Sequence, residues 1–372
     1  MSKFVESISY DKELKRAAEV AVREVLAIKE GETVLIVSNP DDEVRRISEA
    51  VFNASVNSGG RTTLVFQEPK TQLDFAEDSV IKAIESNPDV FISISRHKLG
   101  KDRLRMKDPI SEGGKEYDHI FTYLWKTKKL RSFWSPSITA KMFSETVPID
   151  YGELRGNARR LKEILDTADA VHITAKAGTD IGMGLKGRTT HLDDGDFREP
   201  GLGGNLPAGE VYISPELNAS EGTIVYDGSI SAHRGVIIIR TPVRVEVEGN
   251  SITNIKGGDE AKALENALDV SRDTALDMAE KGSLTKEQSE EYIKGSRCLG
   301  ELGIGLNMKA EIVGNMLEDE KVYGTCHIAI GSNHDEDVKS FTHLDGLVWF
   351  PTITAILSDG SKETIMRDGK LV

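Results

Sequence analysis

The N-terminal part of the chain alternates amphipathic helical segments with short runs of consecutive apolar residues. Strands made of consecutive apolar residues are buried on both faces, as in a parallel sheet that is covered by helices. The alternation therefore predicts a doubly wound parallel sheet. The helices are expected at 14–28, 43–58 and 79–86, and the strands at 33–37, 62–66 and 90–94.

The turns of this region argue against a nucleotide cofactor. The first strand-to-helix turn reads Ser38-Asn39-Pro40-Asp41 and lacks the glycines that let a backbone approach a phosphate. A G-x-G-x-x-G match occurs later, at 182–187, but the sequence after it continues as loop or strand and not as a helix. In and beside this match, Lys186 and Arg188 are expected either to face the functional site as substrate-binding residues or to make structural ion pairs.

The second half of the chain has a different pattern. A charged helical segment over 151–168 joins the halves, and short apolar strands separated by Gly, Asn and Asp turns follow it. Helices interrupt these strands at 258–300, and strands return at 327–330 and 347–357. The Asp359-Gly360 pair has the sequence of a tight hairpin turn. This half is therefore predicted to be rich in antiparallel strands.

Length and pattern together predict two domains. With 372 residues, the chain is long enough for two separate hydrophobic cores. We expect an α/β protein with a doubly wound (Rossmann-like) α/β domain at 1–165, followed by a β-rich α+β domain at 166–372.

Charge and cysteine content exclude several classes of protein. The net charge of -14 argues against a nucleic-acid binder, since neutralising phosphates requires clustered Lys and Arg. Cys298 and Cys326 are too few for a disulfide framework. The N-terminus is too charged for a secretory leader, and no apolar run approaches the length of a membrane span. We expect a cytoplasmic protein with no nucleic-acid or membrane partner.

Two short segments near the C-terminus place metal-ligating residues in strand-like sequence. His327 follows Cys326 in an apolar run, and His343 and Asp345 are two residues apart. Side chains alternate along a strand, so His343 and Asp345 point to one face, whereas Cys326 points to the face opposite His327. Imidazole and carboxylate together suit Zn, Mn, Co or Fe(II), and a buried unpaired carboxylate is costly. The sequence predicts a metal enzyme whose site lies in the β-rich domain.

Two glutamates join this group through the sequences around them. Glu210 opens a short strand after a glycine-rich loop, and Glu301 lies in an almost uncharged run. On composition alone, either could be a turn or edge carboxylate. Together with the His and Asp segments, their surroundings resemble the M29 family of metallo-aminopeptidases (aminopeptidase T/S type). The shared phrases follow family order and are Gly178-Thr179-Asp180 to Leu185-Lys186-Gly187-Arg188, Asn205-Leu206-Pro207-Ala208-Gly209-Glu210-Val211, Leu299-Gly300-Glu301, His327-Ile328-Ala329-Ile330-Gly331 and His343-Leu344-Asp345.

The resemblance implies a dinuclear site and hydrolysis of peptides. Two divalent ions (Zn, Co or Mn) about 3.5–4 Å apart would be bridged by carboxylates, with Glu301 counted among the catalytic residues. A metal-activated water would attack the scissile carbonyl, one ion polarising that carbonyl and the other holding the free α-amine. The family also implies a homodimer with a largely enclosed site. The metal ligands carried over from the family are Glu210, Glu301, His327, His343 and Asp345.

One position departs from the family. A catalytic tyrosine is expected seven residues after the histidine of the His-Ile-Ala-x-Gly phrase, and His334 stands there. If that tyrosine stabilises an oxyanion, His334 could donate the hydrogen bond instead, as a second catalytic residue. It could equally become an extra ligand or mark a change of chemistry.

A second function stays open because M29-like proteins include a ring-cleaving dioxygenase that acts on dihydroxypyridine with a mononuclear iron. His327, His343 and Asp345 alone would form a two-histidine, one-carboxylate triad for Fe(II), with open positions for substrate and O₂. The missing tyrosine favours this alternative, whereas the two glutamates favour the dinuclear hydrolase. We expect an aminopeptidase acting on peptides, with an Fe(II) dioxygenase acting on a small molecule as the alternative. A non-catalytic metal-binding or oligomeric scaffold is the third interpretation.

Overall fold

The computed structural model describes residues 11–71 and 73–372, and the chain divides into two compact units. One unit takes in the chain through Arg155 together with Asp193–Ala208, and the other is made of Gly156–Leu192 and Gly209–Val372. The chain therefore returns to the first unit after entering the second. The single domain boundary predicted between residues 165 and 166 stays a prediction. It did not include the return of Asp193–Ala208 to the first unit.

The first unit is built on a five-stranded sheet in which every pair is parallel, in the order β10-β6-β3-β1-β2. The predicted parallel sheet is confirmed. Its edge strand β10 comes from the returning segment, and no sequence feature predicted it. The strands are β1 (Thr33–Ser38), β2 (Arg61–Phe66), β3 (Val90–Ser95), β6 (Arg131–Pro136) and β10 (Gly203–Asn205), and a separate hairpin is formed by β4 (Ile110–Glu112) and β5 (Lys115–Tyr117).

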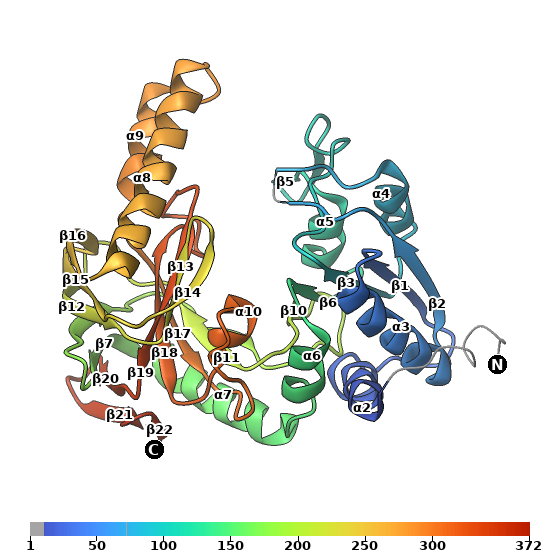
Figure 1. The fold of residues 1–372 in the computed structure, drawn as a ribbon, viewed down its shortest axis with the longest axis horizontal. Helices are drawn as coiled ribbons and strands as arrows, with labels where there is room; N and C mark the ends of the chain where they lie inside the picture. Colours follow the sequence, from blue (N-terminus) through green and yellow to red (C-terminus); the bar gives the residue numbers. More distant parts are fainter. Residues whose placement is uncertain (1–10, 72) are drawn as a thin grey trace. The chain divides into compact units, whose positions relative to one another are not determined.

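The helices of this unit form two groups, one on each face of the sheet (Figure 1). Helices α2, α3 and α6 pack against one another, and α4 and α5 pack against each other. The helix predicted at 14–28 ends earlier, because its last turn widens into a π-helical segment, η1. The helices are α2 (Lys12–Val20), η1 (Ala21–Val25), α3 (Asp42–Asn57), α4 (Asp78–Glu85), α5 (Ile120–Lys126) and α6 (Ala140–Thr146).

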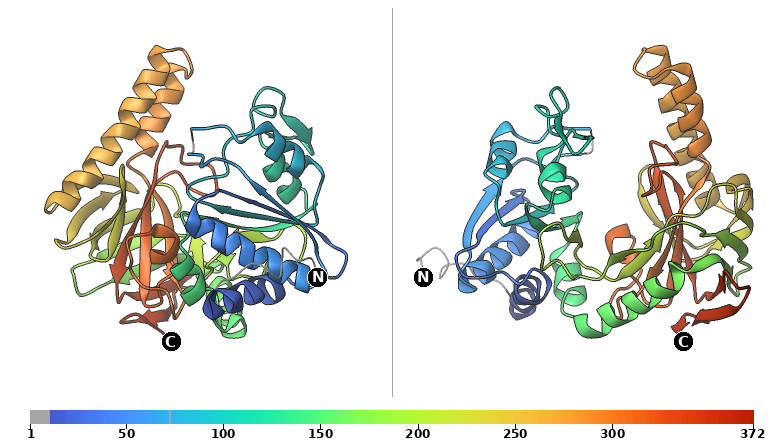
Figure 2. Two further views of the ribbon diagram at one scale, coloured as in Figure 1. Left: turned by 45° about the vertical axis from the view of Figure 1, so that its right-hand side comes forward. Right: turned by 180° about the vertical axis from the view of Figure 1, so that it is seen from behind.

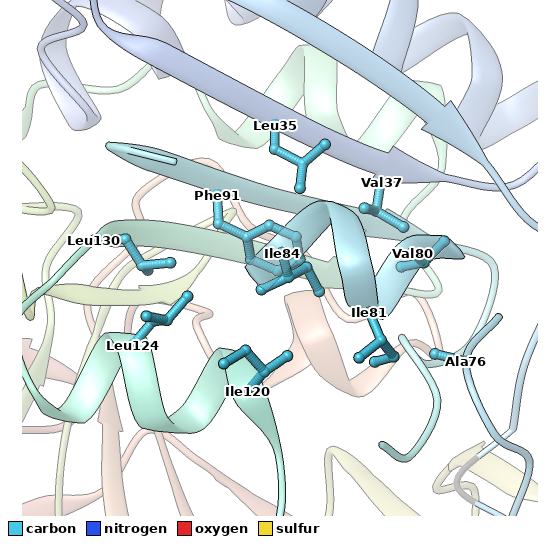
Figure 3. Packing of buried hydrophobic residues seen from close by; sticks show 10 residues of the cluster. All are labelled: Leu35, Val37, Ala76, Val80, Ile81, Ile84, Phe91, Ile120, Leu124 and Leu130. Carbon is cyan, nitrogen blue, oxygen red and sulfur yellow. The ribbon is translucent and has the colours of Figure 1, made fainter. Parts of the chain in front are cut away.

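An apolar cluster joins the sheet to α4 and α5 (Figure 3). Leu35 and Val37 of β1 and Phe91 of β3 point toward Ile81 and Ile84 of α4, and all five are almost completely buried. Fully burying side chains of this size stabilises a fold by about 1.5–3 kcal/mol each. The alternate residues of the same strands are buried on the other face. This two-sided burial explains why the strand sequences are continuously apolar.

Arg131 ties the start of β6 to the loop that precedes β1. Its side chain is 3% exposed, and its guanidinium contacts both carboxylate oxygens of Glu32, at 3.0 and 2.6 Å. It also donates to the backbone carbonyls of Leu26 and Ala27. Burial alone would raise the pKa of Glu32, but Arg131 and the backbone of Lys29 hold it below its usual value.

Replacing Arg131 by methionine is expected to lower the free energy of unfolding by about 3 kcal/mol, because it leaves a shielded carboxylate and two carbonyls without their donor. The pKa of Glu32 is lower in the folded protein than in the unfolded chain. Its contribution to stability is therefore fully present at a pH above the unfolded-state pKa and is lost as the pH falls through the folded-state pKa. The variant should therefore also show a shallower loss of stability in acid, measured by urea unfolding at several pH values. The control Arg46→Met removes an exposed pair with Asp11 and should cost under about 1 kcal/mol. Equal losses in the two variants would contradict the argument.

The second unit contains two antiparallel sheets, which confirms the predicted β-rich fold. The first has the order β14-β13-β19-β18-β17-β11-β9, and the second has the order β16-β15-β12-β8-β7-β20-β21-β22. Strands of the first are β9 (His191–Asp193), β11 (Glu210–Ile213), β13 (Ser229–Ala232), β14 (Gly235–Ile238), β17 (Leu299–Gly305), β18 (Thr325–Gly331) and β19 (His343–Trp349). Strands of the second are β7 (Ala168–Thr174), β8 (Asp180–Gly184), β12 (Ser220–Tyr226), β15 (Val243–Glu248), β16 (Ser251–Lys256), β20 (Thr352–Leu357), β21 (Lys362–Arg367) and β22 (Lys370–Leu371).

One long strand was predicted wrongly near the C-terminus. The apolar run at 347–357 is divided between β19 and β20, because Phe350 has a φ of 49° and Pro351 follows it. The predicted Asp359-Gly360 turn is confirmed, since β20 and β21 pair as an antiparallel hairpin around it. A break at Phe350 places β19 in the first sheet and β20 in the second.

Helices α8 and α9 belong to the second unit and form a helical hairpin that projects from its sheets, where helices were expected at 258–300 (Figures 1 and 2). None of the helices in the described part of the chain combines the length and the apolar character that a membrane span needs. The remaining helices are α7 (Tyr151–Leu165), α8 (Asp259–Glu280), α9 (Lys286–Gly295) and α10 (Met316–Asp319).

Candidate metal centre

Four neighbouring strands of the seven-stranded sheet present the predicted ligands on one face. In the antiparallel register, Glu301 and Asp345 both pair with Ala329, and His343 pairs with Gly331. Paired residues point to the same side of a sheet, and residues two apart along a strand share a face. His327 of β18 and Glu210 of β11 therefore lie on this face as well. All five predicted ligands come from the second unit.

Glycines on the same face make room for these side chains. Gly303 pairs with His327, and a Cβ on Gly303 would fall 2.0 Å from the Cε1 and Nε2 atoms of that imidazole. Gly305 pairs with Glu210, and a Cβ there would fall 2.1 Å from the Val322 carbonyl oxygen. The imidazole and the chain near Val322 can approach β17 only because these positions carry no side chain.

Glu301, His343 and Asp345 form the group that could hold a metal ion. One ligand atom from each lies within 4.8 Å of the others, and His343 Nε2 is 3.1 Å from Asp345 Oδ1. His343 Nδ1 lies 2.7 Å from the carbonyl oxygen of Ser332, which makes Nδ1 the donor and leaves Nε2, the nitrogen that faces Asp345, as the one that could bind an ion. When several ligand atoms each lie about 2.0–2.2 Å from one ion, their separations from one another are of the same order as the separations found in this group. The donor set and its orientation fit one divalent ion.

His327 lies between two glutamates beside this group. Its Nε2 atom is 3.2 Å from Glu301 Oε1 and 3.4 Å from Glu210 Oε2, and the ring is fully buried. Burial alone would lower the pKa of His327, but the hydrogen bond with Glu301 and the charge of Glu210 raise it to about 9. An imidazolium is therefore the expected form in the absence of metal.

The carboxylates of the group are held ionised although they are buried. Burial alone would raise the pKa of Asp345, but the adjacent His343 lowers it to about 2. The pKa of Glu301 is likewise lowered, against the effect of burial, by its hydrogen bond with His327. The pKa of His343 is raised well above its usual value, because the attraction of Asp345 exceeds the effect of burial. Negative charge concentrated among imidazoles is what a cation site requires.

Glu210 has a partner that sequence reasoning missed. The fully buried Lys321 donates from Nζ to Glu210 Oε1 at 2.6 Å and also contacts Glu320. The predicted dinuclear site is therefore not supported. The structure brings Glu301, His343 and Asp345 together as a one-ion group, and Glu210 makes an ion pair with a lysine. A lysine in the Glu-Asp-Glu-Lys run near the C-terminal strands was the only available signal.

Aromatic side chains lie beside Glu301. His334 Nδ1 is 4.0 Å from Glu301 Oε2, and His334 Nε2 is 3.2 Å from the Tyr212 hydroxyl. The ring of His191 stacks on Tyr212 at 5.2 Å between centroids and lies 5.2 Å from the ring of His334. Sequence reasoning placed His334 here through the family pattern and missed Tyr212, which shares the metal face of the sheet because it pairs with Gly303.

The two predicted substrate-binding cations lie in different settings. Arg188 makes ion pairs with Asp337 at 2.8 Å and Asp335 at 3.5 Å, and so fastens the loop that carries His334. Lys186 is exposed in its own loop. Arg188 therefore makes structural ion pairs, which was one of the two roles expected, and substrate binding by Lys186 and Arg188 stays a prediction.

Cys326 lies on the opposite face of β18, where it pairs with Ile304 and Val348. Burial raises its pKa to about 12, so the side chain is a neutral thiol at physiological pH. It packs in the core, as predicted. Tyr226 of β12 reaches this side of the sheet and donates to the carbonyl oxygen of Ile328.

Comparison with known proteins points to one enzyme family over part of the chain. The family model described as "NicX: 2,5-dihydroxypyridine 5,6-dioxygenase" matches residues 127–278. The 2,5-dihydroxypyridine 5,6-dioxygenase of Pseudomonas putida is 31% identical over 111 residues, which is 28% of this chain and 30% of that protein. The family match includes Glu210 and ends before Glu301.

Two solved structures share the fold. The 2,5-dihydroxypyridine dioxygenase of Pseudomonas putida KT2440 superposes with a TM-score of 0.70 at 18% identity, covering 96% of both chains. AmpT from Thermus thermophilus superposes with a TM-score of 0.66 at 15% identity, covering 98% of this chain and all of the other. At these identities the likeness concerns the fold, and the predicted M29-type fold is confirmed at that level.

The predicted aminopeptidase is overturned by these findings. Both the family model and the sequence relative are dioxygenases, so the prediction of a hydrolase was wrong. The predicted resemblance to M29 peptidases holds for the fold, which AmpT shares at 15% identity. The sequence phrases did not predict that Glu210 would form an ion pair with Lys321 in the folded chain.

Proposed function

We propose that this protein is a ring-cleaving dioxygenase that uses one ferrous ion to oxidise a dihydroxylated nitrogen heteroaromatic of the 2,5-dihydroxypyridine class. The observation that carries the proposal is the one-ion ligand group of Glu301, His343 and Asp345 in a chain whose sequence matches the dioxygenase family model. A dinuclear hydrolase would need Glu210 as a metal ligand, and Lys321 holds that carboxylate.

Glu301, His343 and Asp345 would hold the ion. Ferrous iron bound by imidazole and carboxylate with open positions supplies the chemistry that joins O₂ to an aromatic ring. Ser332 fixes the His343 ring through its carbonyl, and His327 holds Glu301 through Nε2. This ligand set differs from the predicted triad in containing Glu301, while His327 serves as the partner that orients it.

The aromatic side chains beside Glu301 suit a planar, hydroxylated substrate. The rings of His191, Tyr212 and His334, which contact one another in stacked, tilted and edge-on pairs, offer faces for an aromatic ring and polar edges for its hydroxyl groups. His334 bridges the Tyr212 hydroxyl and the neighbourhood of Glu301, so it is placed to accept a proton from a substrate hydroxyl. Binding such a substrate as its anion strengthens its attraction to a cation.

Oxygen consumption tests this proposal. Protein reconstituted with Fe²⁺ under anaerobic conditions is expected to consume O₂ when 2,5-dihydroxypyridine is added, with matching loss of the substrate's ultraviolet absorbance. His343→Gln should lower turnover at least about 100-fold by removing a ligand, whereas the exposed His233→Gln should leave it unchanged. Aminoacyl chromogenic amides serve as the second substrate class. Iron-loaded protein that consumes no O₂ with any dihydroxypyridine, or that cleaves the amides instead, would refute the proposal.

A further inference from the structure

Lys321 is a charged side chain with no exposure to solvent. It follows the short helix α10, and its backbone is fixed on both sides: its N–H donates to the Glu318 carbonyl, and its carbonyl accepts from Asn307 N–H. A buried lysine is costly unless its ammonium is paired with an anion. Its position is therefore built into the fold, and its partners should explain why a charge is kept there.

Those partners connect the ammonium to the metal group. Nζ lies 2.6 Å from Glu210 Oε1, and the other oxygen of Glu210 is 3.4 Å from His327 Nε2. The same imidazole nitrogen is 3.2 Å from Glu301 Oε1. The ammonium thus acts on the carboxylate that lies one imidazole away from the candidate metal ligands.

A glycine makes this approach feasible. Gly305 faces Glu210 across the β11–β17 pair, and a Cβ at Gly305 would lie 2.1 Å from Val322 O and 2.9 Å from the carbonyl carbon of Lys321. The segment carrying Lys321 can lie against β17 only without a side chain there. The glycine at position 305 of β17 is therefore required for Lys321 to reach Glu210.

Charge balance limits what this face of the sheet can bind. Glu210, Glu301 and Asp345 carry three negative charges, and Glu320, which also contacts the Lys321 ammonium, adds a fourth. One divalent ion and the ammonium offset three of these four charges. A second divalent ion would need Glu210 as a ligand and would therefore lie close to the Lys321 ammonium. The two cations would repel each other strongly in these buried, low-dielectric surroundings.

We propose that the Lys321 ammonium takes the role of a second cation on Glu210 and thereby restricts the site to a single metal ion. The inference rests on the one-ion site of the proposed function. In this interpretation Lys321 binds no metal itself and sets the number of bound ions by occupying Glu210. Removing the ammonium while keeping Glu210 should therefore open a second divalent site formed by Glu210 and His327, with room left by the missing side chain.

Metal stoichiometry tests this directly. Full-length wild type, Lys321→Ala, and the double variant Lys321→Ala/Glu210→Gln are stripped with a chelator and titrated with Mn²⁺ and with Co²⁺. Bound metal per chain is then measured by mass spectrometry after gel filtration, and thermal unfolding is followed with and without metal. The exposed Lys309→Ala serves as the matched lysine control.

The expected stoichiometry is one ion for wild type and Lys309→Ala, two for Lys321→Ala, and one again for the double variant. Lys321→Ala should also gain more thermal stability from added metal than wild type does. Wild type binding two ions, or folded Lys321→Ala binding one, overturns the inference. So does a Lys321→Ala protein that stays unfolded in excess metal while the double variant folds. Failure of the proposed function would appear separately, as iron-loaded wild type that binds one ion and consumes no O₂.

Discussion

Replacing Asp345 by asparagine is expected to abolish metal binding and activity together. The substitution keeps the shape of the side chain and removes the carboxylate that lies 3.1 Å from His343 Nε2 within the ligand group. Changing even an outer partner of a metal ligand costs about 10- to 100-fold in affinity. Loss of a charged ligand should therefore lower the affinity for Fe²⁺ or Mn²⁺ by at least about 100-fold, measured by calorimetric titration of the stripped protein.

The same substitution at an exposed aspartate gives the matched control. Asp359→Asn changes the turn of the β20–β21 hairpin from Asp-Gly to Asn-Gly, which is an equally good hairpin turn. Its metal affinity and oxygen consumption should equal those of wild type. If Asp345→Asn retained wild-type affinity with an unchanged circular dichroism spectrum, Asp345 would not be a ligand, and the site would have to be sought elsewhere.

Replacing Gly303 by alanine is expected to disrupt the centre without touching any ligand. The added Cβ would fall 2.0 Å from two atoms of the His327 ring, and His327 is fully buried. The ring must move, so its bond with Glu301 breaks and the orientation of that carboxylate is lost. Overpacking of this kind costs about 1–3 kcal/mol of stability. Metal affinity should fall about 10- to 100-fold, the usual cost of removing a ligand's partner.

A double-mutant cycle separates the clash from a general effect of alanine in a strand. If the ring causes the loss, Gly303→Ala should add little further destabilisation in a His327→Ala background. Gly156→Ala, in the open surroundings of helix α7, should instead stabilise the protein by about 1 kcal/mol. Additive losses from the changes at 303 and 327, measured by chemical unfolding, would show that the ring is not what Gly303 accommodates.

The fold of each unit followed closely from periodicity. Strands such as Val90–Ser95 are buried on both faces, so their sequence is continuously apolar and easily told from the amphipathic helices beside them. The edge strand Gly203–Asn205 was missed, because three residues with two glycines carry no period. Its place in the parallel sheet depends on the return of the chain to the first unit.

The candidate ligands were also accessible from sequence, but their grouping was not. Alternation along a strand predicts that His343 and Asp345 share a face, and both lie on one side of β19. The choice of Glu301 over His327 as the third member depends on the register between β17 and β18, which includes an irregularity between Leu299 and Glu301. The register between two strands is set only when they pair, so it could not be read from either strand sequence alone.

The sequence by itself determined the parallel α/β unit, the β-rich unit and the inventory of residues that could bind a metal, because periodicity and residue chemistry are local. Only the tertiary structure decided which charged groups lie beside those residues. Lys321 is far from Glu210 in sequence, yet its ammonium lies 2.6 Å from that carboxylate in the folded chain. The charge on a buried carboxylate depends on what the fold places beside it, and no local pattern carries that information.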